Sequence, residues 1–123
     1  MHEMGIAVSI YRIARDAVAS QPPGRLCTVR VAVGELSAVE PDLLRYAWEA
    51  VTAEGVDAGA ELDVDWCRAR QFCPSCNEEK DRTEGGWLRL CPDCAQPLRV
   101  EGGTELDVVR VEYDAEEDDE QGC

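Results

Sequence analysis

The fold is decided by the stretch Glu61–Trp66, which reads Glu-Leu-Asp-Val-Asp-Trp and alternates strictly between acidic and apolar side chains. Successive side chains of a β-strand point to opposite faces of the sheet, so this period of two predicts a strand with one buried face. We expect Leu62, Val64 and Trp66 to point into the core.

A first helix is expected within residues 4–20, where apolar side chains recur at intervals of four, three and four residues. That spacing lines one face of a helix. The helix should end near Ser20, because the two prolines in Gln21–Gly24 cannot continue it. Its core face would consist of Ile6, Ile10, Ile13 and Ala17.

A second helix is expected to begin at Glu40–Asp42, where Pro41 suits the first turn and the acids lie near the positive end of the helix dipole. Gly55 is a typical C-terminal stop for this helix. The stripe facing the core would consist of Leu43, Leu44, Ala47, Trp48 and Val51.

The sequence predicts two further strands. One lies between the helices, where a period of two would bury Cys27, Val29, Val31 and Val33. The other covers residues 106–113, and its imperfect alternation indicates a β-bulge or an edge position. Because this last strand returns after the strand at Glu61–Trp66, we expect those two to be antiparallel neighbours.

Four of the seven cysteines form two pairs, Cys73–Cys76 and Cys91–Cys94, in the pattern C-x₂-C-x₁₄-C-x₂-C. Two residues between thiols allow one tight turn to present both sulfurs to the same ion, and two such turns complete a tetrahedron. Four thiolates on Zn²⁺ leave no open position for a substrate, so the predicted role is structural. Two disulfides or an iron–sulfur centre are the alternatives.

The cellular compartment helps to choose between these alternatives. Met1–Gly5 shows no basic segment leading into an apolar stretch and a cleavage site, so we read no secretory signal and expect a cytoplasmic protein. Clustered thiols more often bind metal there, which favours zinc. Zinc would also supply folding free energy to residues 73–94, whose apolar content is too small for a core. We expect Cys27 and Cys67 to be small buried hydrophobic residues, and Cys123 to have no role.

The order helix, strand, helix, strand, insertion, strand predicts an α+β fold. In it, two helices lie on one face of a three-stranded mixed sheet, with an inserted zinc-ribbon-like domain. We divide the chain into an α/β domain of residues 1–70 plus 104–113, a zinc-binding insertion of residues 71–103 and an acidic tail of residues 114–123. The tail is low in complexity and is expected to be disordered.

The net charge of the chain limits the classes of molecule that it is expected to bind. The chain has 12 Lys and Arg against 26 Asp and Glu, which gives −14 at pH 7. Such a surface repels phosphate backbones and anionic lipid, so we expect no nucleic acid and no membrane as partner, and we favour cations, including metal ions. We find no nucleophile-and-base arrangement, Gly-rich phosphate loop or open catalytic zinc site in the sequence, and therefore do not expect an enzyme.

The one histidine of the chain is His2. The α-amine of Met1 with the amide and imidazole nitrogens of His2 can form adjoining chelate rings on a d⁸ ion such as Ni(II), and Cu(II) would fit at least as well. Glu3 could add its amide or carboxylate, although an acid is also expected at a helix start. A solvated N-terminal turn without metal is the alternative.

Together these features resemble the HypA/HybF family of [NiFe]-hydrogenase maturation factors. The resemblance runs from residue 1 to about 113 and rests on Met1–Met4 (Met-His-Glu-Met), Gly34–Ser37 (Gly-Glu-Leu-Ser), Pro41, the two Cys-Pro-x-Cys pairs and Glu105-Leu106. Gly5 stands where the family pattern leads us to expect a serine or similar residue, and the acidic tail is an addition.

The resemblance implies a nickel metallochaperone that binds Ni(II) at its N-terminus and helps to deliver it to the [NiFe]-hydrogenase large subunit alongside a hydrogenase maturation GTPase. The implied nickel ligands are His2, Met1 and Glu3. The implied ligands of a structural Zn(II) are Cys73, Cys76, Cys91 and Cys94. A rival hypothesis is a zinc-ribbon protein-interaction module with no nickel role, and a third is a zinc-dependent regulator that responds to thiol oxidation.

Overall fold

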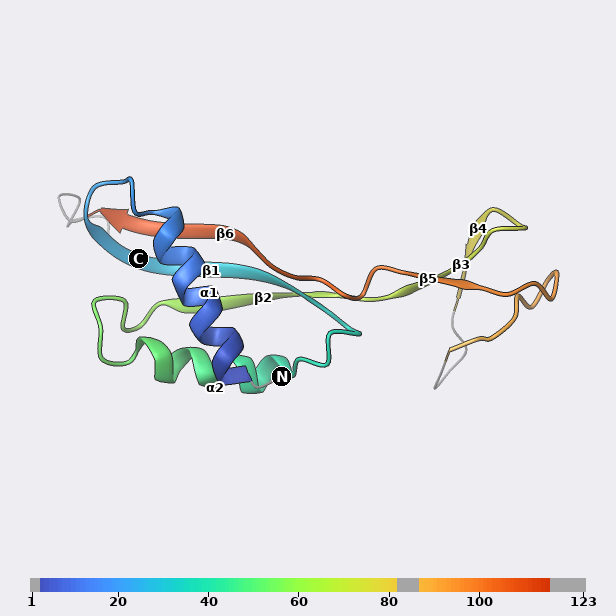
Figure 1. Cartoon of the computed structure of the whole chain (residues 1–123), viewed down its shortest axis with the longest axis horizontal. Helices are drawn as coiled ribbons and strands as arrows, with labels where there is room; N and C mark the ends of the chain where they lie inside the picture. The colour runs from blue at the N-terminus through green and yellow to red at the C-terminus, as the bar shows by residue number, and fades with distance from the viewer. Residues whose placement is uncertain (1–2, 82–86, 116–123) are drawn as a thin grey trace.

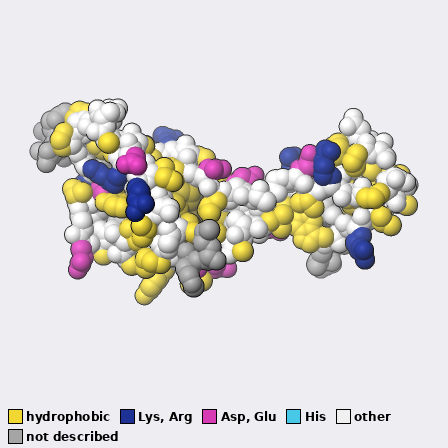
Figure 2. All heavy atoms as spheres, viewed as in Figure 1, with side chains coloured by type: hydrophobic (Ala, Val, Ile, Leu, Met, Phe, Trp, Pro, Cys, Tyr) yellow, Lys and Arg dark blue, Asp and Glu magenta, His cyan; other side chains and the backbone are white. Residues whose placement is uncertain are grey.

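In a computed structural model that describes residues 3–81 and 87–115, the chain forms two lobes joined by a narrow waist (Figures 1 and 2). The larger, helical lobe contains α1 (Glu3–Ala17), β1 (Gly24–Gly34), α2 (Pro41–Thr52), β2 (Glu61–Cys67) and β6 (Leu106–Ala115). The smaller, cysteine lobe contains β3 (Arg70–Cys73), β4 (Glu78–Lys80) and β5 (Arg99–Glu101). Neither of the two described helices has the length and apolar character needed to cross a membrane.

The helical lobe confirms the predicted α+β class, with α1 and α2 on one face of a mixed three-stranded sheet (Figure 1). The strand order is β2-β1-β6, with β2 parallel and β6 antiparallel to β1. The expectation that the last strand lies beside β2 is therefore wrong. β1 takes the centre because Leu26, Val29, Val31 and Val33 are all fully buried, whereas the more charged β2 and β6 suit the two edges.

Two irregularities in the pairing of β1 with β6 decide which side chains reach the core. Leu26 pairs with Tyr113 and Thr28 with Glu112, so Cys27 is an extra residue in β1. Cys27 is half-buried and disulfide-bonded, and the expectation of a buried small hydrophobic residue there is wrong. The second shift leaves Val109 without a partner in register, which confirms the predicted bulge within residues 106–113.

The face that α1 buries is rotated from the predicted one. The helix buries Ile6, Ala7, Ile10 and Ala14, whereas Ile13 and Ala17 are exposed. The small side chains of Ala7 and Ala14 let α1 approach the sheet and α2 closely, which leaves Ile13 at the rim. α1 ends at Ala17, and a turn follows it up to the prolines.

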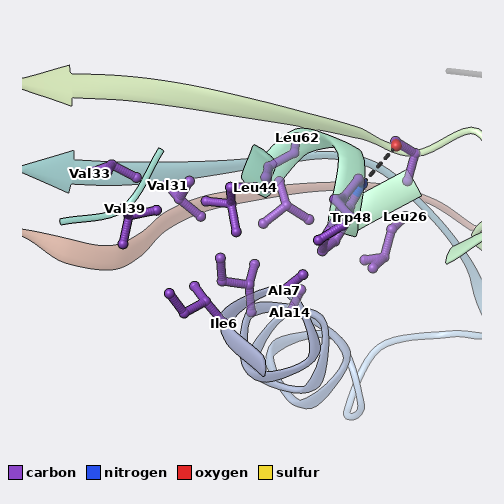
Figure 3. Close-up of a cluster of buried hydrophobic side chains, with 14 residues drawn as sticks. Ile6, Ala7, Ala14, Leu26, Val31, Val33, Val39, Leu44, Trp48 and Leu62 are labelled. Atoms are coloured by element: carbon purple, nitrogen blue, oxygen red, sulfur yellow. Dashed lines mark hydrogen bonds between the residues drawn. The ribbon is translucent and has the colours of Figure 1, made fainter. Parts of the chain in front are cut away.

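Helix α2 begins at Pro41 as predicted and is anchored by Trp48. The indole N–H of Trp48 donates a 2.8 Å hydrogen bond to the carbonyl oxygen of Ala60 (Figure 3), and the ring lies edge-on to Tyr11. Leu43 is exposed, contrary to expectation, because adjacent residues on a helix project about 100° apart and Leu44 takes the core position.

β2 is buried at its start and exposed at its end. Leu62 is buried and Val64 half-buried, but Trp66 is exposed, which corrects its predicted place in the core. The strand runs past the helices toward the waist, so its last residues have no helix above them (Figure 1). Cys67 is half-buried there. At the other edge β6 continues to Ala115, so the first two residues of the expected tail are strand, and residues 116–123 lie outside the described part.

A buried carboxylate that the sequence analysis did not single out joins three parts of the helical lobe. Asp57, with 0% exposure, follows α2 and accepts hydrogen bonds from the Tyr11 hydroxyl (2.5 Å), the Leu26 backbone N–H (2.7 Å) and the Arg15 guanidinium (3.3 Å). Asp57 thereby fixes α1 and the start of β1 to the loop before β2.

Candidate metal centre

The cysteine lobe brings the four predicted thiols together. The sulfurs of Cys73, Cys76, Cys91 and Cys94 all lie within 4.8 Å of one another. Cys73 ends β3 and Cys76 lies in the turn to β4, while Cys91 and Cys94 lie in a second turn ahead of β5. The lobe therefore uses two tight turns, one on each side, to point four sulfurs at a common centre.

The two turns have the same local geometry. In the first, the N–H of Asn77 donates to the carbonyl of Cys73 (2.8 Å), and in the second the N–H of Ala95 donates to that of Cys91 (2.9 Å). Asn77 and Ala95 both adopt positive φ, 57° and 62°, which reverses the chain directly after each pair. Asparagine tolerates this conformation better than alanine does, so Ala95 is held in a less favoured geometry by its surroundings.

Backbone N–H groups also point at the sulfurs. The N–H of Cys76 donates to Sγ of Cys73 (3.3 Å), and the N–H of Asp93 donates to Sγ of Cys91 (3.4 Å). Proline at the second position of each pair removes no donor that these contacts need. Such donors stabilise thiolates, which are the form that binds metal.

The thiols titrate unequally because they share their protons. Burial opposes ionisation of Cys91, but N–H groups of Asp93 and Cys94 outweigh it and lower the pKa of Cys91 to about 7. Hydrogen bonds with the thiols of Cys94 and Cys73 raise the pKa of Cys76 to about 12. A metal ion that displaces these protons would replace the mutual hydrogen bonds of the thiols with metal–sulfur bonds.

The distances fit zinc. Zn–S bonds of about 2.3 Å in a tetrahedron place neighbouring sulfurs about 3.8 Å apart. The Cys73–Cys94 and Cys76–Cys91 sulfur pairs are separated by 3.5 and 3.9 Å. Four closely spaced sulfurs, two of them on buried cysteines, thus match the donor set and the size of a closed structural zinc site.

The predicted nickel ligands are only partly within the described residues. Met1 and His2 lie outside them, whereas Glu3 is the first residue of α1. The backbone N–H of Glu40, at the start of α2, is 3.4 Å from Oε2 of Glu3. The beginnings of the two helices are therefore neighbours.

Two residues of the cysteine lobe were not anticipated from the sequence, namely Gln71 and Lys80. Both are buried although their side chains are polar or charged. Gln71 does lie two residues before Cys73, but its partners are close in space and distant in sequence, so no local pattern indicates its role.

Most of the chain is similar to known proteins. The family described as "Hydrogenase/urease nickel incorporation, metallochaperone, hypA" matches residues 1–113. A hydrogenase maturation factor HypA from Chloroflexus aurantiacus is 40% identical, over 91% of this chain and 98% of that protein. The factor of the same name from Albidiferax ferrireducens is 32% identical, over 93% of this chain and 100% of that protein.

Two solved structures share the fold. The solution structure of the Ni metallochaperone HypA from Helicobacter pylori has a TM-score of 0.62 at 22% identity, covering 94% of this chain and 100% of that one. A second structure, described as the solution structure of HypA protein, has a TM-score of 0.66 at 23% identity, covering 94% of this chain and 98% of that one.

Proposed function

The chain belongs to the HypA family of hydrogenase and urease nickel-incorporation metallochaperones, and from this premise we propose how it binds and passes on its metal. It is a nickel metallochaperone of hydrogenase maturation. The observation that carries this conclusion is the family match over residues 1–113, which includes the N-terminus and both cysteine pairs. A zinc-ribbon interaction module without a nickel role would not require similarity across both lobes.

Nickel is the cargo, and we propose that Met1, His2 and Glu3 bind it. The supporting argument is chemical: an α-amine, an amide and an imidazole in sequence form adjoining chelate rings that suit Ni(II). Glu3 begins α1 beside the start of α2, so the contact with Glu40 holds the first turn in a defined place. A terminus is also accessible to an acceptor protein, as cargo transfer requires.

The test is a nickel titration of the zinc-loaded chain followed by d–d absorption and calorimetry. The His2→Ala variant is expected to lose the high-affinity nickel site, and acetylation of the N-terminus should damage it as well. Asp42→Asn, which removes an exposed acid near the same helix ends, serves as the control and should bind like the unmodified chain. Unchanged affinity in His2→Ala would refute the N-terminal site.

Cys73, Cys76, Cys91 and Cys94 are proposed to hold one structural Zn(II) per chain. The support is the sulfur geometry and the thiolate-directed N–H groups described above. Metal analysis after purification should find one zinc per chain, and Cys73→Ala should lose it. One zinc per chain in Cys73→Ala would show that the ligand set is wrong.

The finer partners are also proposals. We propose that the protein acts in the cytoplasm with a hydrogenase maturation GTPase and donates nickel to the [NiFe]-hydrogenase large subunit. Its net charge of −14 supports protein and metal partners over nucleic acid. The test is nickel transfer from the loaded chain to a purified large-subunit precursor, with and without the GTPase. No transfer in either case, with transfer from a control chaperone, would refute this assignment.

A further inference from the structure

The side-chain amide of Gln71 forms hydrogen bonds in the cysteine lobe of the kind that a backbone amide forms in a sheet. Its side chain is only 2% exposed, and its amide makes two hydrogen bonds to one residue across the lobe. Oε1 accepts from the N–H of Leu88 (3.0 Å), and Nε2 donates to the carbonyl oxygen of Leu88 (2.6 Å). This pairing satisfies both backbone groups of Leu88, as a neighbouring strand would.

Lys80 lies directly opposite Gln71 in the β3–β4 pairing. Its side chain is only 6% exposed, and its ammonium donates to Glu78 and, at 2.5 Å, to Oδ2 of Asp93. Lysine is almost never fully buried unless it is paired. The two carboxylates are 61% and 66% exposed, so the ion pair could have formed in water without burying the lysine. The buried position therefore needs a further reason.

Each side chain has one partner in the opposite half of the metal centre, and Lys80 also contacts Glu78 of its own hairpin. Gln71 and Lys80 stand on the β3–β4 hairpin, which carries Cys73 and Cys76. Leu88 precedes Cys91, and Asp93 lies between Cys91 and Cys94. Each of the two side chains thus reaches from the half with the first cysteine pair to the half with the second.

The reason for burying a lysine here is its contact with the turn of the second cysteine pair. Hydrogen bonds to Asp93 and Glu78 raise the pKa of Lys80, and the neighbouring Cys76 adds to the effect, so the side chain carries its positive charge. The ammonium is held at Asp93, whose backbone N–H donates to Sγ of Cys91.

We propose that Gln71 and Lys80 are the positioning residues of the zinc site. Gln71 holds the segment that leads into the second cysteine pair, and Lys80 holds the Asp93 turn. The inference rests on the proposed zinc site and goes beyond it, because neither residue is a metal ligand.

The test is the rate at which the full chain releases zinc to a chromophoric chelator. Lys80→Met keeps the apolar stem and removes the charge, and Asp93→Asn removes its partner. Each is expected to release zinc at least about tenfold faster, as is usual when a residue supporting a metal ligand is changed. The double variant should be no faster than the faster single variant, because both changes break one ion pair.

A matched control is Arg70→Gln, which breaks an ion pair with Glu79 in the same sheet whose side chains are both exposed. It should change the rate less than about twofold. Lys80→Arg, which keeps the charge, should release zinc more slowly than Lys80→Met. Equal rates for those two variants, or fully additive effects of Lys80→Met and Asp93→Asn, would overturn the role of Lys80.

Gln71 is tested by amide exchange at a single position. In Gln71→Met the N–H of Leu88 loses its acceptor, so its exchange should accelerate while the zinc-loaded lobe stays folded, and zinc release should become faster. Unchanged protection of Leu88 would overturn the role of Gln71. A wild-type chain without zinc would refute the zinc assignment itself. A wild-type chain with one zinc, with Lys80→Met and Gln71→Met releasing it at the wild-type rate, would refute only the positioning role.

Discussion

The backbone N–H of Ala69 donates a 3.0 Å hydrogen bond to Oε1 of Glu35, which ties the turn after β1 to the segment that leads into the cysteine lobe. The same turn holds both connecting segments through its backbone. The N–H of Glu35 donates to the carbonyl of Cys67 (2.8 Å), and the N–H of Leu36 donates to the carbonyl of Gly103 (2.6 Å). Gly34–Ser37 is therefore the place where the chain leaves and re-enters the helical lobe.

Gly34→Ala is expected to destabilise this junction. A Cβ at Gly34 would lie 2.2 Å from the backbone carbonyl of Gly103 and 2.6 Å from the N atom of Glu105, and backbone atoms in a paired segment cannot move aside. We expect a loss of about 2–3 kcal/mol in the free energy of unfolding, measured by thermal melting of the helical lobe. Gly5→Ala is the matched control, because a Cβ there meets nothing within 4 Å and should stabilise α1 by about 0.5–1 kcal/mol. Equal melting temperatures for the two variants would contradict this account of the junction.

Asp57→Asn should weaken the helical lobe. The substitution keeps the shape and removes the charge that three donors share, and charge-assisted hydrogen bonds contribute more than neutral ones. The expected loss is about 2–3 kcal/mol in urea unfolding. Asp42→Asn breaks an exposed pair with Arg45 and should cost less than about 0.5 kcal/mol. A loss in Asp57→Asn as small as that of the control would show that the buried charge is unimportant.

Ionisation of the Tyr11 hydroxyl makes the free energy of unfolding depend on pH in the alkaline range. Its hydrogen bond to Asp57, and then burial, raise its pKa above the ordinary value of 10.0. A raised folded-state pKa stabilises the fold below the unfolded-state pKa, and this contribution disappears as the pH rises through the folded-state value. Unfolding free energy should therefore fall more steeply above pH 10 in the wild type than in Tyr11→Phe, when both are measured by denaturant titration. Parallel pH profiles would exclude Tyr11 as the titrating group.

Removal of zinc is expected to unfold the cysteine lobe and leave the helical lobe folded. The helical lobe has its own core, which includes Leu26, Leu44 and Trp48, whereas metal binding supplies most of the folding free energy of small metal-binding lobes. After treatment with a strong chelator, amide exchange should become fast within β3–β5 and stay slow in β1. Loss of protection in β1 as well would show that the two lobes fold as one unit.

The sequence was most informative where the structure depends on neighbouring residues. The periods in α2 and Glu61–Trp66, and the spacing of the two cysteine pairs, are local patterns that predict a helix, a strand and a metal-binding cluster. The imperfect alternation near Val109 likewise corresponds to a real bulge. Each of these features is fixed within a few residues of chain.

Features that depend on distant contacts were predicted less well. The exposure of Ile13 and Trp66 depends on how far the helices extend over the sheet, and the order of strands depends on which strand buries most apolar surface. Asp57 and its partner Leu26 are 31 residues apart, so its burial leaves no local pattern. The same holds for Gln71 with Leu88, 17 residues away.

The turn at Gly34–Ser37 also determines how costly it is to close the inserted segment. Because it holds Cys67 and Gly103 on either side of one short segment, residues 68–102 form a loop whose two ends are already closed by the helical lobe. For a flexible loop, doubling the length adds only about 0.6 kcal/mol to the cost of closure. The entropic cost of closing this segment is therefore nearly the same for a long flexible insertion as for a short one. Insertions and deletions in the cysteine lobe are consequently almost neutral for the sheet that supports α1.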